Sequence, residues 1–272
     1  MGDSNTSIKM VTLISYLVMA IICTLANFFP IKDMTIIQIG AIYPSLIKPA
    51  DYAYSIFGLI IILLLGFALY QLFPKSEASY KSDALQKIRI YFIISSIAYT
   101  AWVFAWICNF MALSLMLIII NLLSIIMINI IMGTEEFSIK EKTLIRLPFS
   151  MNYAWVTFMT FINVTSLLVS IGWKGLGIPQ SIWTIITMSL LFFICLCNLL
   201  KFKDFIYGLT MIWAYIGILV KHASKSGLSG QYPEIIVAAS IIIILILATG
   251  GYLLLQYKRK RKYELYYRKD IR

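Results

Sequence analysis

Residues 42–73 read "IYPSLIKPADYAYSIFGLIIILLLGFALYQLF". The second half of this stretch is an almost unbroken apolar run, and a transmembrane helix needs roughly 20 mostly apolar residues. The first half holds Pro44 and Pro49, and proline disfavours helix at the residue before it, so we expect the helix to begin after Pro49. Asp51 then lies near the positive end of the helix dipole. The stretch therefore predicts a membrane span with a stiff aromatic turn at its mouth.

Similar apolar blocks recur along the whole chain. Of its 272 residues, 61% are hydrophobic and 13% are charged, against roughly 25% charged residues in a soluble domain. We identify eight candidate spans, at about 10–29, 52–73, 88–110, 112–132, 149–172, 180–200, 205–221 and 233–257. The seventh is short, so a count of seven stays open. The sequence predicts an all-α polytopic membrane protein, with one transmembrane helical bundle over 1–257.

The basic residues predict the orientation, because cytoplasmic loops of membrane proteins carry an excess of Lys and Arg. If both termini are cytoplasmic, the lysines left outside are Lys32, Lys48, Lys174, Lys221 and Lys225. The remaining Lys and Arg lie inside, many of them in the basic tail 258–272, "KRKRKYELYYRKDIR". A basic tail directly after a span is typical of binding to anionic lipid. We expect a multi-pass protein of the cell membrane with this lipid, and no nucleic acid, as a partner.

The predicted spans lack the side chains that most membrane chemistry needs. We find no Asp, Glu, Lys, Arg or His deep in any of them, which counts against proton pumps, proton-coupled transporters and voltage sensors. No acid–base pair or activated nucleophile is recognisable. The four cysteines fall in or beside apolar spans and the chain has one histidine, a poor set for zinc. We therefore expect no enzyme, no metal site and no required cofactor.

Tryptophan placement allows two interpretations. Trp102 and Trp106 are four residues apart and share one helix face, and most other aromatic residues fit an outer interfacial belt. Trp213 lies near the middle of its span, where its indole N–H needs a partner. That partner could be an amide such as Asn163, a helix carbonyl or a ligand. The alternative to the belt is an aromatic pocket that opens toward the outer leaflet.

Lys48 also has two interpretations. Its side chain could lie over the mouth of such a pocket and meet an anionic group of a ligand. It could instead extend its ammonium to lipid phosphate.

Several stretches resemble one family. The segment "YPSLIKPADYAYSIFGL", followed by an apolar run ending in "GFALYQ", is similar to the first loop and second helix of the tryptophan-rich sensory protein (TspO/MBR) family. Further stretches that resemble its longer bacterial relatives are "AWVFAWICNFMALSLMLIIINLL" (101–123), "AWVTFMTFINVTSLLVSIGW" (154–173), "IWTIITMSLLFFICL" and "MIWAYIGILVK" (within 182–221). The resemblance covers most of 42–221, and the order and Trp placement carry it.

The resemblance implies a binding function. Compact members of the family are five-helix bundles that often dimerise and bind porphyrins, with the first outer loop covering a pocket between the helices. It implies a hydrophobic small molecule, with porphyrin as a candidate ligand, and a homodimer. By resemblance, Tyr43, Lys48, Pro49 and Tyr54 belong to that loop or its junction, and Phe57, where longer relatives usually show Trp, to the pocket mouth. The full set of expected ligand-binding residues is Tyr43, Lys48, Pro49, Tyr54, Phe57, Trp102, Trp106, Asn163 and Trp213.

Three functions stay open at this point. The chain could be a membrane binding or sensory protein for a hydrophobic, tetrapyrrole-like molecule. It could be a transporter or facilitator of a lipophilic solute, using the same cavity. It could also be a membrane scaffold without a ligand, acting through a protein partner.

Overall fold

The computed structural model describes residues 2–30, 34–73, 82–135 and 137–270, and in these ranges eight helices are long and apolar enough to cross a membrane. This confirms the count of eight, including the short seventh helix. The long helices are α1 (Gly2–Phe28), α3 (Ile56–Tyr70), α4 (Ser82–Ile107), α5 (Met111–Gly133), α7 (Leu147–Ser170), α8 (Gln180–Phe202), α9 (Phe205–Ala223) and α10 (Pro233–Asp270). The protein is an all-α, multi-pass membrane protein.

Short elements join the long helices. They are α2 (Ile36–Ile42), a 3₁₀ turn (Asp51–Ser55), α6 (Ile139–Glu141), a π turn (Lys142–Arg146) and a second 3₁₀ turn (Gly175–Gly177). The helix of the opening stretch begins after Pro49, as predicted, and its first turn is the tighter 3₁₀ form. Because α6 and the π turn lead directly into α7, the fifth span runs from Ile139 rather than from residue 149.

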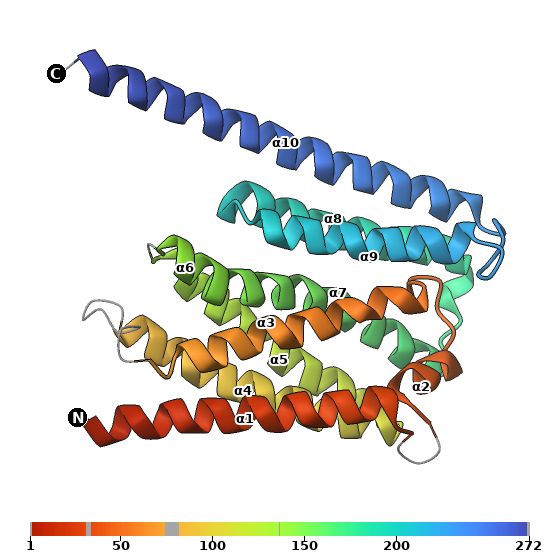
Figure 1. Cartoon of the computed structure of the whole chain (residues 1–272). Coiled ribbons are helices and arrows are strands. Elements are labelled where there is room, and N and C mark those ends of the chain that lie inside the picture. Colours follow the sequence, from red (N-terminus) through yellow and green to blue (C-terminus); the bar gives the residue numbers. More distant parts are fainter. Residues whose placement is uncertain (1, 31–33, 74–81, 136, 271–272) are drawn as a thin grey trace.

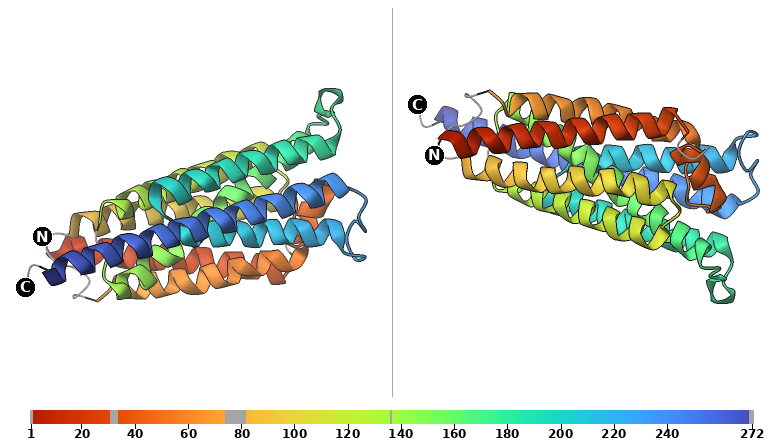
Figure 2. Two further views of the ribbon diagram at one scale, coloured as in Figure 1. Left: turned by 90° about the horizontal axis from the view of Figure 1, so that it is seen from above. Right: turned by 90° about the horizontal axis from the view of Figure 1, so that it is seen from below.

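The long helices lie side by side, with both chain ends at one end of the bundle and α2 at the other (Figures 1 and 2). The end that carries α2 is called the outer end below. Its assignment to the outside of the cell remains a prediction from the basic residues. Helix α10 continues without a break to Asp270, so the backbone of the basic tail extends the last span.

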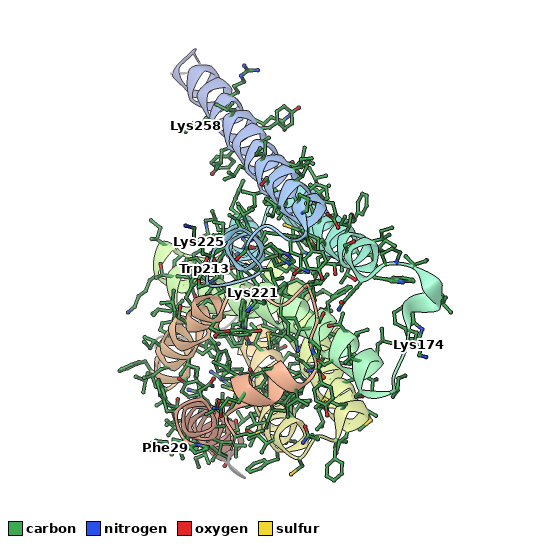
Figure 3. The ribbon with its side chains drawn as sticks, turned by 90° about the vertical axis from the view of Figure 1, so that its right-hand side faces the viewer. Phe29, Lys174, Trp213, Lys221, Lys225 and Lys258 are labelled. Carbon is green, nitrogen blue, oxygen red and sulfur yellow. The ribbon has the colours of Figure 1, made fainter. Side chains whose placement is uncertain are left out.

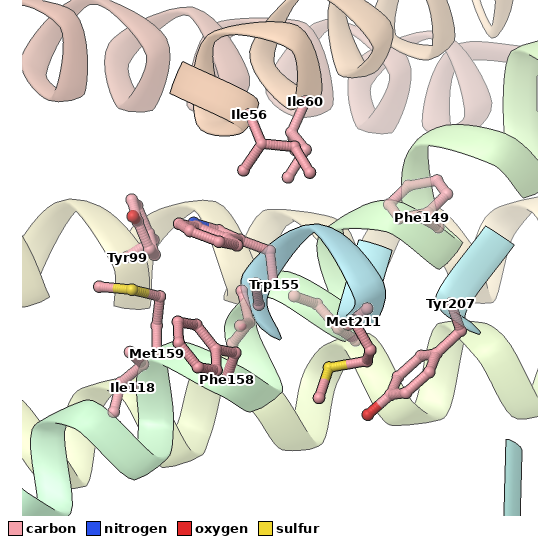
Figure 4. Packing of buried hydrophobic residues seen from close by; sticks show 14 of the residues in the cluster. Ile56, Ile60, Tyr99, Ile118, Phe149, Trp155, Phe158, Met159, Tyr207 and Met211 are labelled. Carbon is pink, nitrogen blue, oxygen red and sulfur yellow. The ribbon is translucent and has the colours of Figure 1, made fainter. Parts of the chain in front are cut away.

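Helix α7 is the centre of the bundle and packs against α3, α5 and α9, while α4 packs on α1 and α5. Figure 4 shows the resulting core, where Ile56, Trp155 and Met211 converge from three different helices. Lipid is as apolar as these side chains, so close packing and interhelical hydrogen bonds hold such a bundle together.

Buried amides supply some of those hydrogen bonds. Ser95 Oγ donates to Asn121 Oδ1 at 2.6 Å, and Ser114 Oγ donates to Asn163 Oδ1 at 2.8 Å. Both pairs join neighbouring helices, as expected for amides inside a membrane bundle. Asn129 behaves differently, because its Nδ2 donates to a carbonyl of its own helix at 2.9 Å.

One basic side chain that was assigned to a cytoplasmic loop is buried in the structure. The orientation predicted from the sequence places Arg89 among the basic residues of the inner loops, yet its side chain is fully buried in α4. Its Nε donates to Gln71 Oε1 at 3.0 Å, and Gln71 Nε2 donates to the Lys9 carbonyl at 2.9 Å. Burial of this charge is tolerated because it is hydrogen-bonded, and the contacts tie α4, α1 and the end of α3 together.

Candidate ligand-binding site

The segment 43–50 crosses the outer end of the bundle and is fastened to α9. The Ala50 N–H donates to the Gly217 carbonyl at 2.9 Å, and His222 Nε2 donates to the Leu46 carbonyl at 2.8 Å. His222 is fully buried at the outer end of α9. The loop is therefore held down at its middle and at its end.

Lys48 joins the loop to the end of α2. Its ammonium donates to the carbonyl oxygens of Gly40 and Tyr43, so it holds the end of α2 against the loop. Burial lowers the pKa of Lys48 to about 8, since a low-dielectric environment disfavours the charged form. The sequence suggested that Lys48 contacts an anionic group of a ligand or a lipid phosphate. In the structure its ammonium instead donates to backbone carbonyls.

Trp213 fastens the turn that follows the loop. Its indole Nε1 donates to the Ala53 carbonyl at 2.9 Å, and its ring packs edge-on against Tyr52 with centroids 5.6 Å apart. Of the three partners considered for this N–H, the structure shows a backbone carbonyl, supplied by the 3₁₀ turn. Figure 3 views the outer end and labels Trp213 and Lys221, which lie about two turns apart on α9.

Beneath the loop lies a cavity of about 510 Å³, here called the aromatic pocket. Its volume falls in the range of roughly 300–1,000 Å³ typical of small-molecule sites. Six aromatic side chains and one methionine of its lining come from the start of α3 and its preceding turn, from α4 and from α7. They are Tyr54, Phe57, Tyr99, Trp102, Trp106, Trp155 and Met159.

One wall of the pocket is a series of stacked rings on α4. Tyr99 and Trp102 have centroids 5.1 Å apart at 27°, and Trp102 and Trp106 are 5.6 Å apart at 25°. Positions 99, 102 and 106 share a helix face because they are three and four residues apart. Phe57 of α3 extends the series, with its ring 5.4 Å from Tyr99.

The other wall comes from α7. Trp155 lies edge-on to Tyr54, with centroids 6.0 Å apart at 84°. In Figure 4 the side chains of Tyr99, Trp155 and Met159 lie together. Aromatic rings in both walls favour a flat, apolar occupant.

The two indole N–H groups of α4 differ in their partners. Trp106 Nε1 donates to the Ile36 carbonyl at 3.1 Å. Trp102 is 1% exposed, and its Nε1 has no hydrogen-bond partner in the structure. An unpaired buried donor costs roughly 1–3 kcal/mol. A bound molecule with a hydrogen-bond acceptor would remove that cost.

Polar side chains gather where the pocket meets the outer end of the bundle. Gln38, Asp51, Gln180 and Lys221 line it there, beside Lys48. The set carries both charges and two amides, so it can meet a polar edge of a ligand whose body lies among the rings.

The structure separates the nine expected ligand-binding residues. Six of them line the aromatic pocket, namely Lys48, Pro49, Tyr54, Phe57, Trp102 and Trp106. The other three, Tyr43, Asn163 and Trp213, do not line it. The Tyr43 hydroxyl donates to Asn109 Oδ1 at 3.3 Å, Asn163 bonds toward α5, and Trp213 is bound to the turn before α3.

The residues that the sequence did not point to include three large side chains in the wall, Tyr99, Trp155 and Met159. Tyr99 could have been found, because it lies three residues before Trp102 on the same face. Trp155 and Met159 share a face of α7 because they are four residues apart. The fifth helix begins earlier than expected, so Trp155 falls near the middle of the span, and its ring contacts Tyr54.

The described residues contain no group of three or more His, Cys, Asp or Glu side chains that could hold a metal ion. The four cysteines are free, and Cys195 is buried while Cys197 is exposed, as expected from their spacing. The chemistry within reach of the pocket is stacking, apolar contact and hydrogen bonding.

Comparison with known proteins assigns the chain to a family. The family model described as TSPO-like protein matches residues 9–252, a wider range than the 42–221 noted from the sequence. No curated protein and no solved structure matches the chain. With nearly its whole length matched, a bundle of membrane helices and a loop closed over an aromatic pocket, the chain belongs to the TSPO-like protein family.

Proposed function

We propose that this protein binds a flat, apolar small molecule with a hydrogen-bond acceptor, of the tetrapyrrole type, in the aromatic pocket. The observation that carries the proposal is the Trp102 indole N–H, buried in the pocket wall without a partner. A protein that only needed to fill this space could use phenylalanine, which has no donor to leave unpaired.

The shape and polarity of the pocket support this class of ligand. A macrocycle can lie between the row of rings on α4 and Trp155 of α7. The acidic groups that many tetrapyrroles carry would lie at the mouth, near Lys221 and the amide of Gln38. Binding, rather than catalysis, is the role that these contacts support.

The test is quenching of tryptophan fluorescence by protoporphyrin, with the protein in lipid nanodiscs. Trp102→Phe keeps a ring and removes the N–H, and loss of one hydrogen bond of roughly 1.5 kcal/mol lowers affinity about tenfold. Trp173→Phe is the matched control, because it also removes one tryptophan but lies outside the pocket. We expect saturable quenching with unchanged affinity in the control. Quenching that rises linearly and equally in all three proteins would contradict the proposal, because it would report partitioning into lipid alone.

A further inference from the structure

A second cavity, here called the side cavity, lies between α7 and α8 and measures about 630 Å³. Phe161, Val164 and Leu168 of α7 face Ile186 and Leu190 of α8 across it. Ile186 is 39% and Leu190 is 51% exposed, and both lie in the membrane-spanning part of α8. Because the exposed surface of such a helix faces acyl chains, the cavity opens sideways into the bilayer.

The polar groups in the walls of the side cavity allow an apolar molecule to pass. Its threonine hydroxyls donate to carbonyls of their own helices, Thr165 at 2.9 Å, Thr184 at 2.9 Å and Thr187 at 2.8 Å. The Trp183 indole N–H donates to the Gly175 carbonyl at 2.9 Å. These donors are already satisfied, so an apolar molecule can pass them without leaving a buried donor unpaired.

The two cavities share a wall that is one chain segment thick. Pro44 and Ser45 line both of them, Ile47 lines the side cavity, and Leu46 and Lys48 line the aromatic pocket. This segment, 44–48, is called the partition. Gln180, at the start of α8, also lines both cavities.

The partition is held in place by a small number of hydrogen bonds. Residues 44–48 belong to no helix. Their hydrogen bonds are the His222 bond to Leu46, the bonds of the Lys48 ammonium to nearby carbonyls and the Lys48 N–H bond to the Ser45 carbonyl at 3.2 Å. Segments with few backbone hydrogen bonds open locally at free energies well below that of global unfolding. Displacing Ser45 and Ile47 would join the two cavities.

We propose that the side cavity is the bilayer-side entrance of the aromatic pocket, with the partition as its gate. A flat, apolar ligand dissolved in the outer leaflet enters between α7 and α8, passes the partition and binds among the rings of the aromatic pocket. This route rests on the proposed function, because it needs a ligand that binds in the pocket.

The test is stopped-flow tryptophan quenching by protoporphyrin in nanodiscs, read as association rate, dissociation rate and affinity. Val164→Phe and Thr187→Phe fill the side cavity without touching the aromatic pocket. Thr249→Phe is the matched control, since Thr249 is a half-buried threonine of α10 that lines neither cavity and also donates to its own helix. We expect both rates to fall about tenfold in the two filled variants, with affinity unchanged, because gating slows entry and exit alike. The control keeps both rates.

Ile47→Ala tests the gate in the opposite sense. Ile47 is 1% exposed and lines the side cavity, so truncating it thins the partition, and we expect both rates to rise. Unchanged rates in both filled variants, with normal affinity, would overturn the route and leave the side cavity to a lipid acyl chain. Absence of saturable binding in the wild type would overturn the proposed function, and the route with it.

Discussion

Gly217 lies where α9 touches the loop over the pocket, and Gly217→Ala tests that contact. An added Cβ would lie 2.7 Å from Pro49 Cβ and 2.7 Å from Ala53 Cβ. Neither atom can rotate away, because one belongs to a proline ring and the other is itself a Cβ. To reach an ordinary separation of about 3.4 Å, the loop or the helix must move by about 0.7 Å. Only glycine fits this approach of helix to loop.

The magnitude follows from two terms. Overpacking a close contact costs about 1–3 kcal/mol. The same movement pulls on the hydrogen bond from Ala50 N to the Gly217 carbonyl, 2.9 Å long, and its loss costs about 0.5–1.5 kcal/mol. Alanine has a higher helix propensity than glycine, by about 1 kcal/mol. That gain cancels in a comparison with Gly250→Ala, because Gly250 lies inside α10 and its added Cβ would meet nothing within 4 Å.

We expect Gly217→Ala to be about 2–4 kcal/mol less stable than Gly250→Ala. The measurement is unfolding in detergent, followed by the reaction of a thiol dye with Cys23 and Cys195, which are buried in the folded protein. Gly250→Ala should unfold at or above the wild-type temperature. Equal stability of the two variants would refute the reasoning, because it would mean that α9 does not approach the loop this closely.

Three further predictions concern the ends of the bundle. Because burial lowers the pKa of Lys48 to about 8 from 10.5, the unfolded chain holds a proton that the folded chain has released between these values. Stability therefore gains from Lys48 as pH rises through that window, and unfolding measured across it should show a weaker gain in Lys48→Met; equal slopes would contradict this. Asp204 accepts from the Tyr207 N–H at 3.1 Å at the start of α9, and from Ser150 Oγ, so Asp204→Ala should lose about 1–3 kcal/mol of stability. Asp204→Asn, which keeps an acceptor oxygen, should lose less, and an equal loss would argue against the cap. Trp213→Phe should lose about 0.5–1.5 kcal/mol with its bond to the turn, yet lower protoporphyrin affinity less than Trp102→Phe does; the reverse order would place Trp213 in the site.

The spans could be predicted from sequence because a membrane leaves few choices. Backbone groups in lipid must be satisfied within the segment, so each apolar run of sufficient length becomes a helix. The face shared by Trp102 and Trp106 follows from their spacing for the same reason. A side chain's hydrogen-bond partner cannot be predicted from local sequence when that partner lies in a distant segment of the chain. The partner of Trp213 lies 160 residues away in the chain, at Ala53, and no periodicity within α9 points to it.

Arg89 shows a second limit. Its position near the start of a span suggests a loop charge, and only the approach of Gln71 from the end of α3 explains how it is buried. The lining of the aromatic pocket could be predicted only in part. Its α4 wall is local and largely predictable, whereas the α7 wall depends on where the fifth helix begins, which the polar residues before it obscure.

The placement of the tryptophans decides between the belt and the pocket. Trp102 is 1% and Trp155 is 2% exposed, so neither can lie among lipid headgroups, and both line the aromatic pocket with Trp106. Trp173 is 36% exposed at the outer end, as a belt residue should be, and with Trp183 it lines the side cavity.

Trp213 belongs to neither group, because its indole holds the turn that carries Tyr54 into the pocket wall. A belt would need rings at the membrane surface and nothing more. The tryptophans instead have three roles. Trp102, Trp106 and Trp155 line the aromatic pocket, and Trp173 and Trp183 line the side cavity. Trp213 holds the turn that follows the loop between the two cavities. That division of roles is what a closed site reached from the bilayer requires.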